Sequence, residues 1–172
     1  MTNTDLEAVF DEHKDAVFRF AWRMTNSMST AEDIAQDVFL SILRHPDRFD
    51  SSRGGLRPFL LGIARNLVLK RWREKNRWEE LDEERFVASP VNIERSETAQ
   101  IVSDAVRALP SLQREVLILA EYEELSLEEI ARAVDAEVGT VKSRLHRARE
   151  NLRRMLAPLK PGACSEVKLW NR

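Results

Sequence analysis

The sequence predicts an all-α protein made of two small helical domains joined by a flexible acidic linker. Apolar residues recur at spacings of three and four in several separate stretches, which is the periodicity of amphipathic helices. No stretch keeps the alternation of apolar and polar residues that marks a strand. One acidic interval without periodicity divides the helical stretches into two groups, so the 172 residues are shared between two thin cores.

Three helices are expected in the first domain. Ser29 and Glu32 predict a capping box at the start of the second helix, Pro46 is expected to end it, and Pro58 is tolerated in the first turn of the third. The inner face of the first helix is expected to hold Leu6, Val9, Phe10, Val17, Phe20, Ala21 and Met24. The inner face of the second is expected to hold Ala31, Ile34, Ala35, Val38, Phe39, Ile42 and Leu43. That of the third is expected to hold Leu56, Phe59, Leu60, Ile63, Ala64 and Leu67.

The interval from about Trp78 to Ile93 predicts an exposed linker. Helical periodicity is lost there, acidic residues accumulate, and Ser89-Pro90 adds a helix breaker. The chain after Pro158 is expected to be loosely ordered. The predicted organisation is a first domain at 1–78, a linker at 79–93, a second domain at 94–158 and a tail at 159–172.

Helical spacing resumes after the linker. It runs from Thr98 to Leu109, stops at Pro110 and restarts at Leu112. Ser126 and Glu129 predict another capping box, which opens a short helix. The inner faces of these three helices are expected to hold Thr98, Ile101, Val102, Ala105, Val106 and Leu109, then Leu112, Val116, Leu119 and Ala120, then Leu127, Ile130, Ala131 and Val134.

The end of the second domain has the pattern of a helix-turn-helix. A turn at 135–138 separates the short capped helix from a basic helix that starts near Gly139-Thr140. Its inner face is expected to hold Val141, Leu145, Ala148 and Leu152. Its outward positions are Lys142, Ser143, His146, Arg147 and Arg149, donors suited to phosphates and guanine edges. A basic helix alone is more often a solvated face, but the capped helix and turn before it favour DNA binding.

Charge is distributed unevenly along the chain. The formal net charge is only -2, yet bases exceed acids by about five in each of the segments 65–77 and 142–154. Two separated basic helices indicate two contacts with one polyanion.

Other features of the composition exclude several classes of protein. The longest apolar run, Val116 to Ala120, is far shorter than the roughly 20 residues of a membrane-spanning helix, and Asp5 and Glu7 stand where a secretory signal would be basic. We therefore expect a cytoplasmic protein. Cys164 is the only cysteine and cannot form an internal disulfide, and the three histidines lack metal-ligand spacing, so neither structural zinc nor another cofactor is expected.

From about Leu6 to Leu156 the sequence resembles the extracytoplasmic-function (ECF) branch of bacterial sigma factors. Residues 31–40, AEDIAQDVFL, are similar to that family's region 2.2, which binds the polymerase β′ clamp helices. Residues 59–66, FLLGIARN, are similar to regions 2.3 and 2.4, which open and read the -10 element. Residues 109–156, with GTVKSR at 139–144, are similar to region 4, which reads the -35 element. Phe59 stands where many relatives carry Trp, a departure we attribute to the core.

The resemblance implies three sets of site residues. The polymerase-binding set is Asp33, Gln36, Asp37 and Leu40. The -10 set is Arg65, Asn66, Lys70 and Arg73, with Arg53 and Arg57 from the preceding loop. The -35 set adds Thr140 and Arg144 to the outward residues of the basic helix. Trp72 and Trp78, which interleave with the bases of the third helix, are interpreted as packing residues.

The implied function is that of an alternative sigma factor, which directs promoter-specific initiation without a catalytic residue of its own. Its implied partners are RNA polymerase core, through the β′ clamp helices and the β flap, promoter DNA, and an anti-sigma factor, without insertion of this chain into the membrane. One alternative is a helix-turn-helix regulator with its own sensory domain, although the first domain shows no strand or ligand pocket pattern. Another is a helical enzyme, but there is no Gly-rich phosphate loop, no histidine pair and no G-x-S-x-G turn.

Overall fold

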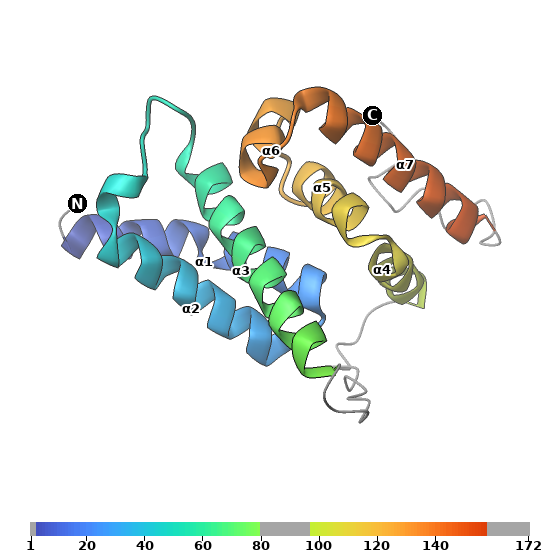
Figure 1. The fold of residues 1–172 in the computed structure, drawn as a ribbon, viewed down its shortest axis with the longest axis horizontal. Coiled ribbons are helices and arrows are strands. Elements are labelled where there is room, and N and C mark those ends of the chain that lie inside the picture. Colours follow the sequence, from blue (N-terminus) through green and yellow to red (C-terminus); the bar gives the residue numbers. More distant parts are fainter. Residues whose placement is uncertain (1–2, 80–96, 158–172) are drawn as a thin grey trace. The chain divides into compact units, whose positions relative to one another are not determined.

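The computed structural model describes residues 3–79 and 97–157, which form helices and contain no strand (Figure 1). The chain divides into two compact units, and each is described by itself. The all-α prediction with two helical domains is confirmed over this part of the chain. The predicted linker and tail fall almost wholly outside the described residues, so the proposed domain boundaries stay a prediction.

Three helices build the first unit. They are α1 (Asn3–Thr25), α2 (Met28–Arg44) and α3 (Leu56–Glu79), with a short 3-10 turn, η1 (Pro46–Arg48), after α2. Each of the three α-helices packs against the other two, and α1 lies along α2 (Figure 1). Their shared core contains Val17, Phe20, Ala21 and Met24 of α1, Ala31, Ile34, Val38, Phe39 and Ile42 of α2, and Leu60, Leu61, Ala64 and Val68 of α3.

The start of α2 differs from the prediction. Ser27, not Ser29, is the N-cap, and its Oγ accepts a hydrogen bond from the Thr30 backbone N–H at 3.3 Å. Between α1 and α2, Asn26 takes a positive φ of 54°. Ser27 follows in an extended conformation, which is the conformation of an N-cap residue, and α2 begins at the next residue. The predicted Ser29–Glu32 capping box is therefore wrong, because Ser29 already lies inside α2.

The end of α2 is as predicted. The helix stops at Arg44, and the His45 backbone N–H closes it by donating to the carbonyls of Ser41 and Ile42. Pro46 then opens η1 instead of extending α2.

Several residues predicted to face inward lie at the margin of this core. Leu43 is 53% exposed and Phe10 is 42% exposed, although the Phe10 ring packs edge-on against Phe39 with a centroid separation of 4.8 Å. On α3, Leu61 is fully buried and Phe59 is only half-buried, so the inner face is rotated from the predicted one. The contiguous apolar run 59–61 fits either face, and periodicity alone does not choose between them.

Four helices build the second unit: α4 (Glu97–Ala108), α5 (Ser111–Glu121), α6 (Leu127–Val134) and α7 (Val138–Leu156). α7 packs against both α5 and α4. The predicted inner face of α7 is confirmed, since Val141, Leu145, Ala148 and Leu152 are all buried. Ile101 and Leu112, also predicted inward, are instead exposed at the starts of their helices.

The capping box before α6 is confirmed. The Glu129 backbone N–H donates to Ser126 Oγ at 3.2 Å, and the Ser126 backbone N–H donates to Glu129 Oε2 at 2.8 Å. After α6, Asp135 takes a positive φ of 52°, and the chain turns directly into α7 (Figure 1). This short capped helix, tight turn and long second helix form the predicted helix-turn-helix.

Candidate functional site

One exposed face of α2 carries the residues predicted to bind polymerase. Asp33, Gln36 and Asp37 are exposed and Leu40 is half-buried. They lie opposite the buried side chains of Ile34 and Val38, because positions three and four apart share a helix face. The structure therefore brings the four predicted residues together on one acidic surface, which we call the α2 acidic face.

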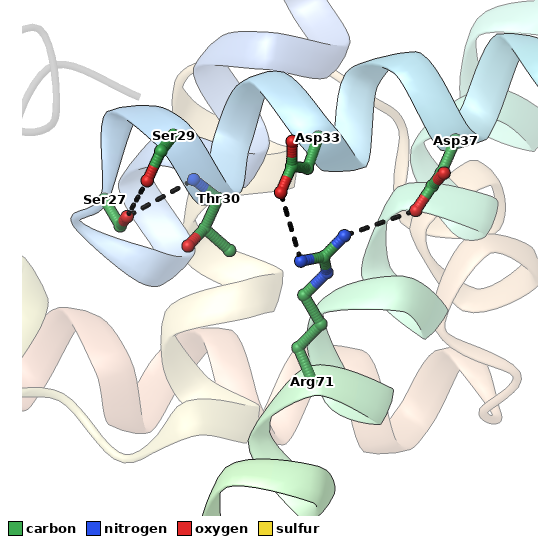
Figure 2. A network of polar contacts seen from close by, with 6 residues as sticks. All are labelled: Ser27, Ser29, Thr30, Asp33, Asp37 and Arg71. Atoms are coloured by element: carbon green, nitrogen blue, oxygen red, sulfur yellow. Dashed lines mark hydrogen bonds and ion pairs between the residues drawn. The ribbon is translucent and has the colours of Figure 1, made fainter.

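Arg71 of α3 reaches this acidic face, as Figure 2 shows. Its Nη1 lies 3.4 Å from Asp33 Oδ2 and its Nη2 lies 3.3 Å from Asp37 Oδ2. One guanidinium thus bridges two carboxylates that are one helical turn apart. No local pattern predicts this bridge, since Arg71 lies 38 and 34 positions from the two aspartates.

The outer face of α3 carries most of the predicted -10 set. Asn66, Lys70 and Arg73 are exposed, and Asn66 and Lys70 share a face because they are four residues apart. Arg65 is half-buried and donates from Nη1 to Asn66 Oδ1 at 3.3 Å. The outer face of α3 thus places an amide beside several cations.

The loop before α3 carries the other two members of that set. Arg53 is exposed and Arg57 is half-buried in the first turn of α3. The carboxylate of Asp50 organises the loop by accepting hydrogen bonds from the Ser52 hydroxyl at 2.6 Å and the Ser52 backbone N–H at 2.9 Å. These hydrogen bonds lower the pKa of Asp50, because they stabilise its charged form.

The base of the same loop is held by an aromatic contact. The Phe49 ring packs against the Phe59 ring with centroids 5.4 Å apart. Phe59 therefore holds the loop against α3 from the margin of the core, not from inside it as expected.

The exposed face of α7 carries five residues of the predicted -35 set. Thr140, Lys142, Ser143, His146 and Arg147 are exposed, opposite the buried inner face of the helix. We call these five the α7 outer face. The helix follows the tight turn after α6, so these donors stand in the first three turns of the second helix of the helix-turn-helix.

The other two predicted residues, Arg144 and Arg149, are half-buried and paired within the unit. Arg144 Nη1 lies 3.6 Å from Oε1 of Glu115, a carboxylate of α5 that is fully buried. Arg149 donates from both Nε, at 2.9 Å, and Nη2 to Glu121 Oε1 at the end of α5. The sequence reasoning missed Glu115 and Glu121. A signal existed for Glu115, because it falls at helical spacing with the buried Leu119.

Among the residues whose side chains are described, no group of three or more His, Cys, Asp or Glu is placed to hold a metal ion. No helix in the described ranges is long and apolar enough to cross a membrane.

Comparison with known proteins assigns both units. The sigma-70 region 2 family matches residues 9–78, and the sigma-70 region 4 family matches residues 99–152. The chain is 34% identical to the ECF RNA polymerase sigma factor SigW of Bacillus subtilis, over 88% of each chain. It is 29% identical to the ECF sigma factor SigL of Mycobacterium tuberculosis, over 90% of each chain.

A solved structure agrees with these matches. It is a co-crystal structure of the sigma factor RpoE with the anti-sigma factor NepR from Bartonella quintana. The likeness covers 91% of this chain and 99% of that one, with a TM-score of 0.80 and 27% sequence identity. The two family matches and the relatives that share both units in the same order lead to one conclusion. The chain belongs to the ECF RNA polymerase sigma factors, the alternative sigma factors that direct transcription initiation.

Proposed function

We propose that this sigma factor uses three separate surfaces: the α2 acidic face for polymerase core, the outer face of α3 for the -10 strand, and the α7 outer face for the -35 duplex. The observation that carries the proposal is the helix-turn-helix of the second unit, with its exposed donors, in a chain whose first unit presents an acidic face and a basic one. Two DNA contacts joined by the chain at 79–93 raise the effective concentration of each for the other.

The α2 acidic face suits a basic helical partner. Asp33 and Asp37 supply carboxylates, Gln36 an amide and Leu40 a half-buried apolar contact. Charge complementarity of this kind fixes the orientation of a partner and speeds association. We assign this face to the β′ clamp helices, as the family implies, and the second unit to the β flap.

The outer face of α3 suits single-stranded DNA. Lys70 and Arg73 supply cations for the backbone, while Asn66 supplies both a donor and an acceptor for a base edge. Arg65 orients that amide through its hydrogen bond to Oδ1. We place Arg53 and Arg57 on the path of the same strand. Binding the unpaired strand favours the melted promoter, because a ligand shifts an equilibrium toward the state it binds.

The α7 outer face suits duplex DNA. Lys142 and Arg147 supply cations for phosphates and guanine edges, and Thr140, Ser143 and His146 add shorter polar groups. Steep weakening by salt is expected, because each neutralised phosphate releases counterions. No step in this proposal needs a catalytic residue of the chain, since polymerase core supplies the chemistry.

The proposal extends to regulation and compartment. The related RpoE was crystallised with an anti-sigma factor, and we propose that a protein of that class holds this chain inactive until a signal arrives. A partner of RNA polymerase acts in the cytoplasm, and we place this chain there.

Reconstitution with sigma-free polymerase core tests the proposed function. Transcript starts mapped after overexpression would first supply a candidate promoter. Adding the purified chain to core should then give initiation at that promoter and not at a scrambled template. A chain that neither associates with core nor changes where it starts, with no inhibitor present, is not acting as a sigma factor.

A further inference from the structure

We propose that Arg144 and Arg149 are positioning residues, which fix α7 on α5 and leave DNA contact to the α7 outer face. The inference deepens the proposed -35 function and rests on it. By sequence position all seven polar residues of the early part of α7 look equivalent. The structure separates two of them, because their guanidiniums are engaged inside the second unit.

Glu115 makes the strongest case. Its side chain is 0% exposed, while the Arg144 side chain that faces it across the α5–α7 contact is 25% exposed. A carboxylate removed from water needs a nearby cation and hydrogen bonds to stay charged. If Arg144 turned outward to DNA, the buried Glu115 carboxylate would lose this ion pair, and that loss favours a guanidinium held inward.

A second pair lies farther along the same two helices. Arg149 donates from two nitrogens to Glu121 Oε1, and the Glu121 side chain is only 11% exposed. Asn151 Nδ2 also donates to Gln113 Oε1 at 2.8 Å. Arg144 and Arg149 are separated by about 7.5 Å along α7, five residues at a rise of about 1.5 Å each. Added to the buried apolar face of α7, polar contacts at separate levels hold both the rotation and the axial position of the helix on α5.

That setting decides which side chains α7 presents. With Arg144 and Arg149 directed toward α5, Lys142, Ser143 and Arg147 remain on the exposed side of the helix. The two paired guanidiniums neutralise carboxylates of the protein, so they are not available to neutralise phosphates. They therefore add nothing to the salt dependence of DNA binding, to which each phosphate-neutralising cation adds about 0.9 in log-log slope.

The salt slope separates contact from positioning. The affinity of the full chain for a duplex carrying the mapped -35 element would be measured at salt concentrations from about 50 to about 200 mM. Arg147→Ala should reduce the slope by about 0.9 and leave the melting temperature unchanged. The paired variant Glu115→Leu/Arg144→Met replaces the buried ion pair by apolar side chains and should keep the wild-type slope.

Arg144→Met alone is the matched control for folding. It leaves the Glu115 carboxylate buried without that partner, so its melting temperature should fall, and the paired variant should recover most of the loss. The paired variant is expected to fold, since apolar replacement of a buried ion pair is often neutral or stabilising, so the slope test does not depend on the single variant. A slope reduced in the paired variant as much as in Arg147→Ala would overturn the inference, since Arg144 would then neutralise a phosphate.

A readout of positioning comes from Arg149→Met. This variant should keep the slope but lower, several-fold, the ratio of binding to the -35 duplex over a scrambled duplex, and Arg149→Lys should restore part of it. If this binding ratio is the same in Arg149→Met and in wild type, Arg149 only stabilises the fold, and its part of the inference is overturned. Failure of the proposed function itself looks different: the wild-type chain would show no preference for the -35 duplex at all.

Discussion

Arg71 Nη1 lies 3.4 Å from Asp33 Oδ2, an ion pair that joins the basic helix α3 to the acidic face of α2. The same guanidinium reaches Asp37, so both carboxylates predicted to bind polymerase already face a cation of the chain (Figure 2). A basic partner helix that binds this face competes with Arg71 for them. The internal bridge is weak, because exposed ion pairs contribute only about 0.2–1 kcal/mol.

Arg71→Ala is expected to strengthen binding to polymerase core by about two- to five-fold, because it removes from the free state the weak exposed bridge to Asp33 and Asp37. Competition binding to core with a labelled wild-type chain measures the change. Arg48→Ala, which removes the same charge from η1, is the matched control and should bind core as wild type does. Equal gains in the two variants would attribute the effect to net charge, and a loss in Arg71→Ala would mean that the bridge organises the face.

Asn66→Ala is expected to impair promoter opening while leaving affinity for the closed duplex nearly unchanged. The amide lies on the outer face of α3, where Arg65 orients it, and its hydrogen bonds serve an unpaired base. Permanganate footprinting of the -10 region with reconstituted holoenzyme measures opening, and duplex binding of the same complex measures affinity.

Arg147→Ala is the complementary variant. It should weaken the duplex contact by roughly ten-fold, as loss of one good base or phosphate contact does, while an already opened promoter stays reactive to permanganate. Equal losses in both assays by both variants would contradict the proposed division of labour between α3 and α7.

The predictions that succeeded rest on local physics. In α7 the spacing of Val141, Leu145, Ala148 and Leu152 defines one apolar face, and the outward residues follow from it. The box at Ser126 and Glu129 needs only two side chains and two backbone N–H groups within one turn. Such features depend on neighbours in sequence, and the sequence determines them.

The features that the sequence did not reveal depend on packing. Arg71 is one of several bases on α3, and only the crossing of α3 with α2 selects it to face Asp33. In the same way Glu115 and Arg144 meet only because α5 and α7 pack together. The cap at Ser27 was missed because α2 begins at Met28, before the predicted capping box, directly after a turn in which Asn26 has a positive φ.

The loop before α3 yields a prediction about pH. The Ser52 hydroxyl and backbone N–H stabilise the Asp50 carboxylate and hold its pKa below the ordinary value of 3.8. At pH values above 3.8 the ionised Asp50 therefore stabilises the folded loop. This contribution is lost as the pH falls through the lower pKa that Asp50 has in the folded protein. An NMR titration should show Ser52→Ala raising the pKa of Asp50 toward 3.8, because the hydroxyl hydrogen bond is its largest cause.

Ser51→Ala is the control for that titration. The hydrogen bonds to the Asp50 carboxylate come from Ser52, and the Ser51 hydroxyl is not among the donors. It should leave the Asp50 pKa at its wild-type value. A pKa of Asp50 that is the same in Ser52→Ala and wild type would show that the hydroxyl does not hold the carboxylate in solution.

The capping box before α6 is expected to stabilise the helix-turn-helix as a coupled pair. Ser126→Ala removes the acceptor for the Glu129 N–H and should lower the free energy of unfolding by about 0.5–2 kcal/mol. Glu129→Ala removes the acceptor for the Ser126 N–H, and the double variant should lose less than the sum, because each half orients the other. Urea unfolding followed by circular dichroism measures all three, with Glu128→Ala, in the first turn of α6 but outside the box, as the control. Strictly additive losses would mean that the two hydrogen bonds form independently.

Since α6 precedes the turn into α7, the variants of the capping box should also weaken binding to the -35 duplex, in proportion to their loss of stability.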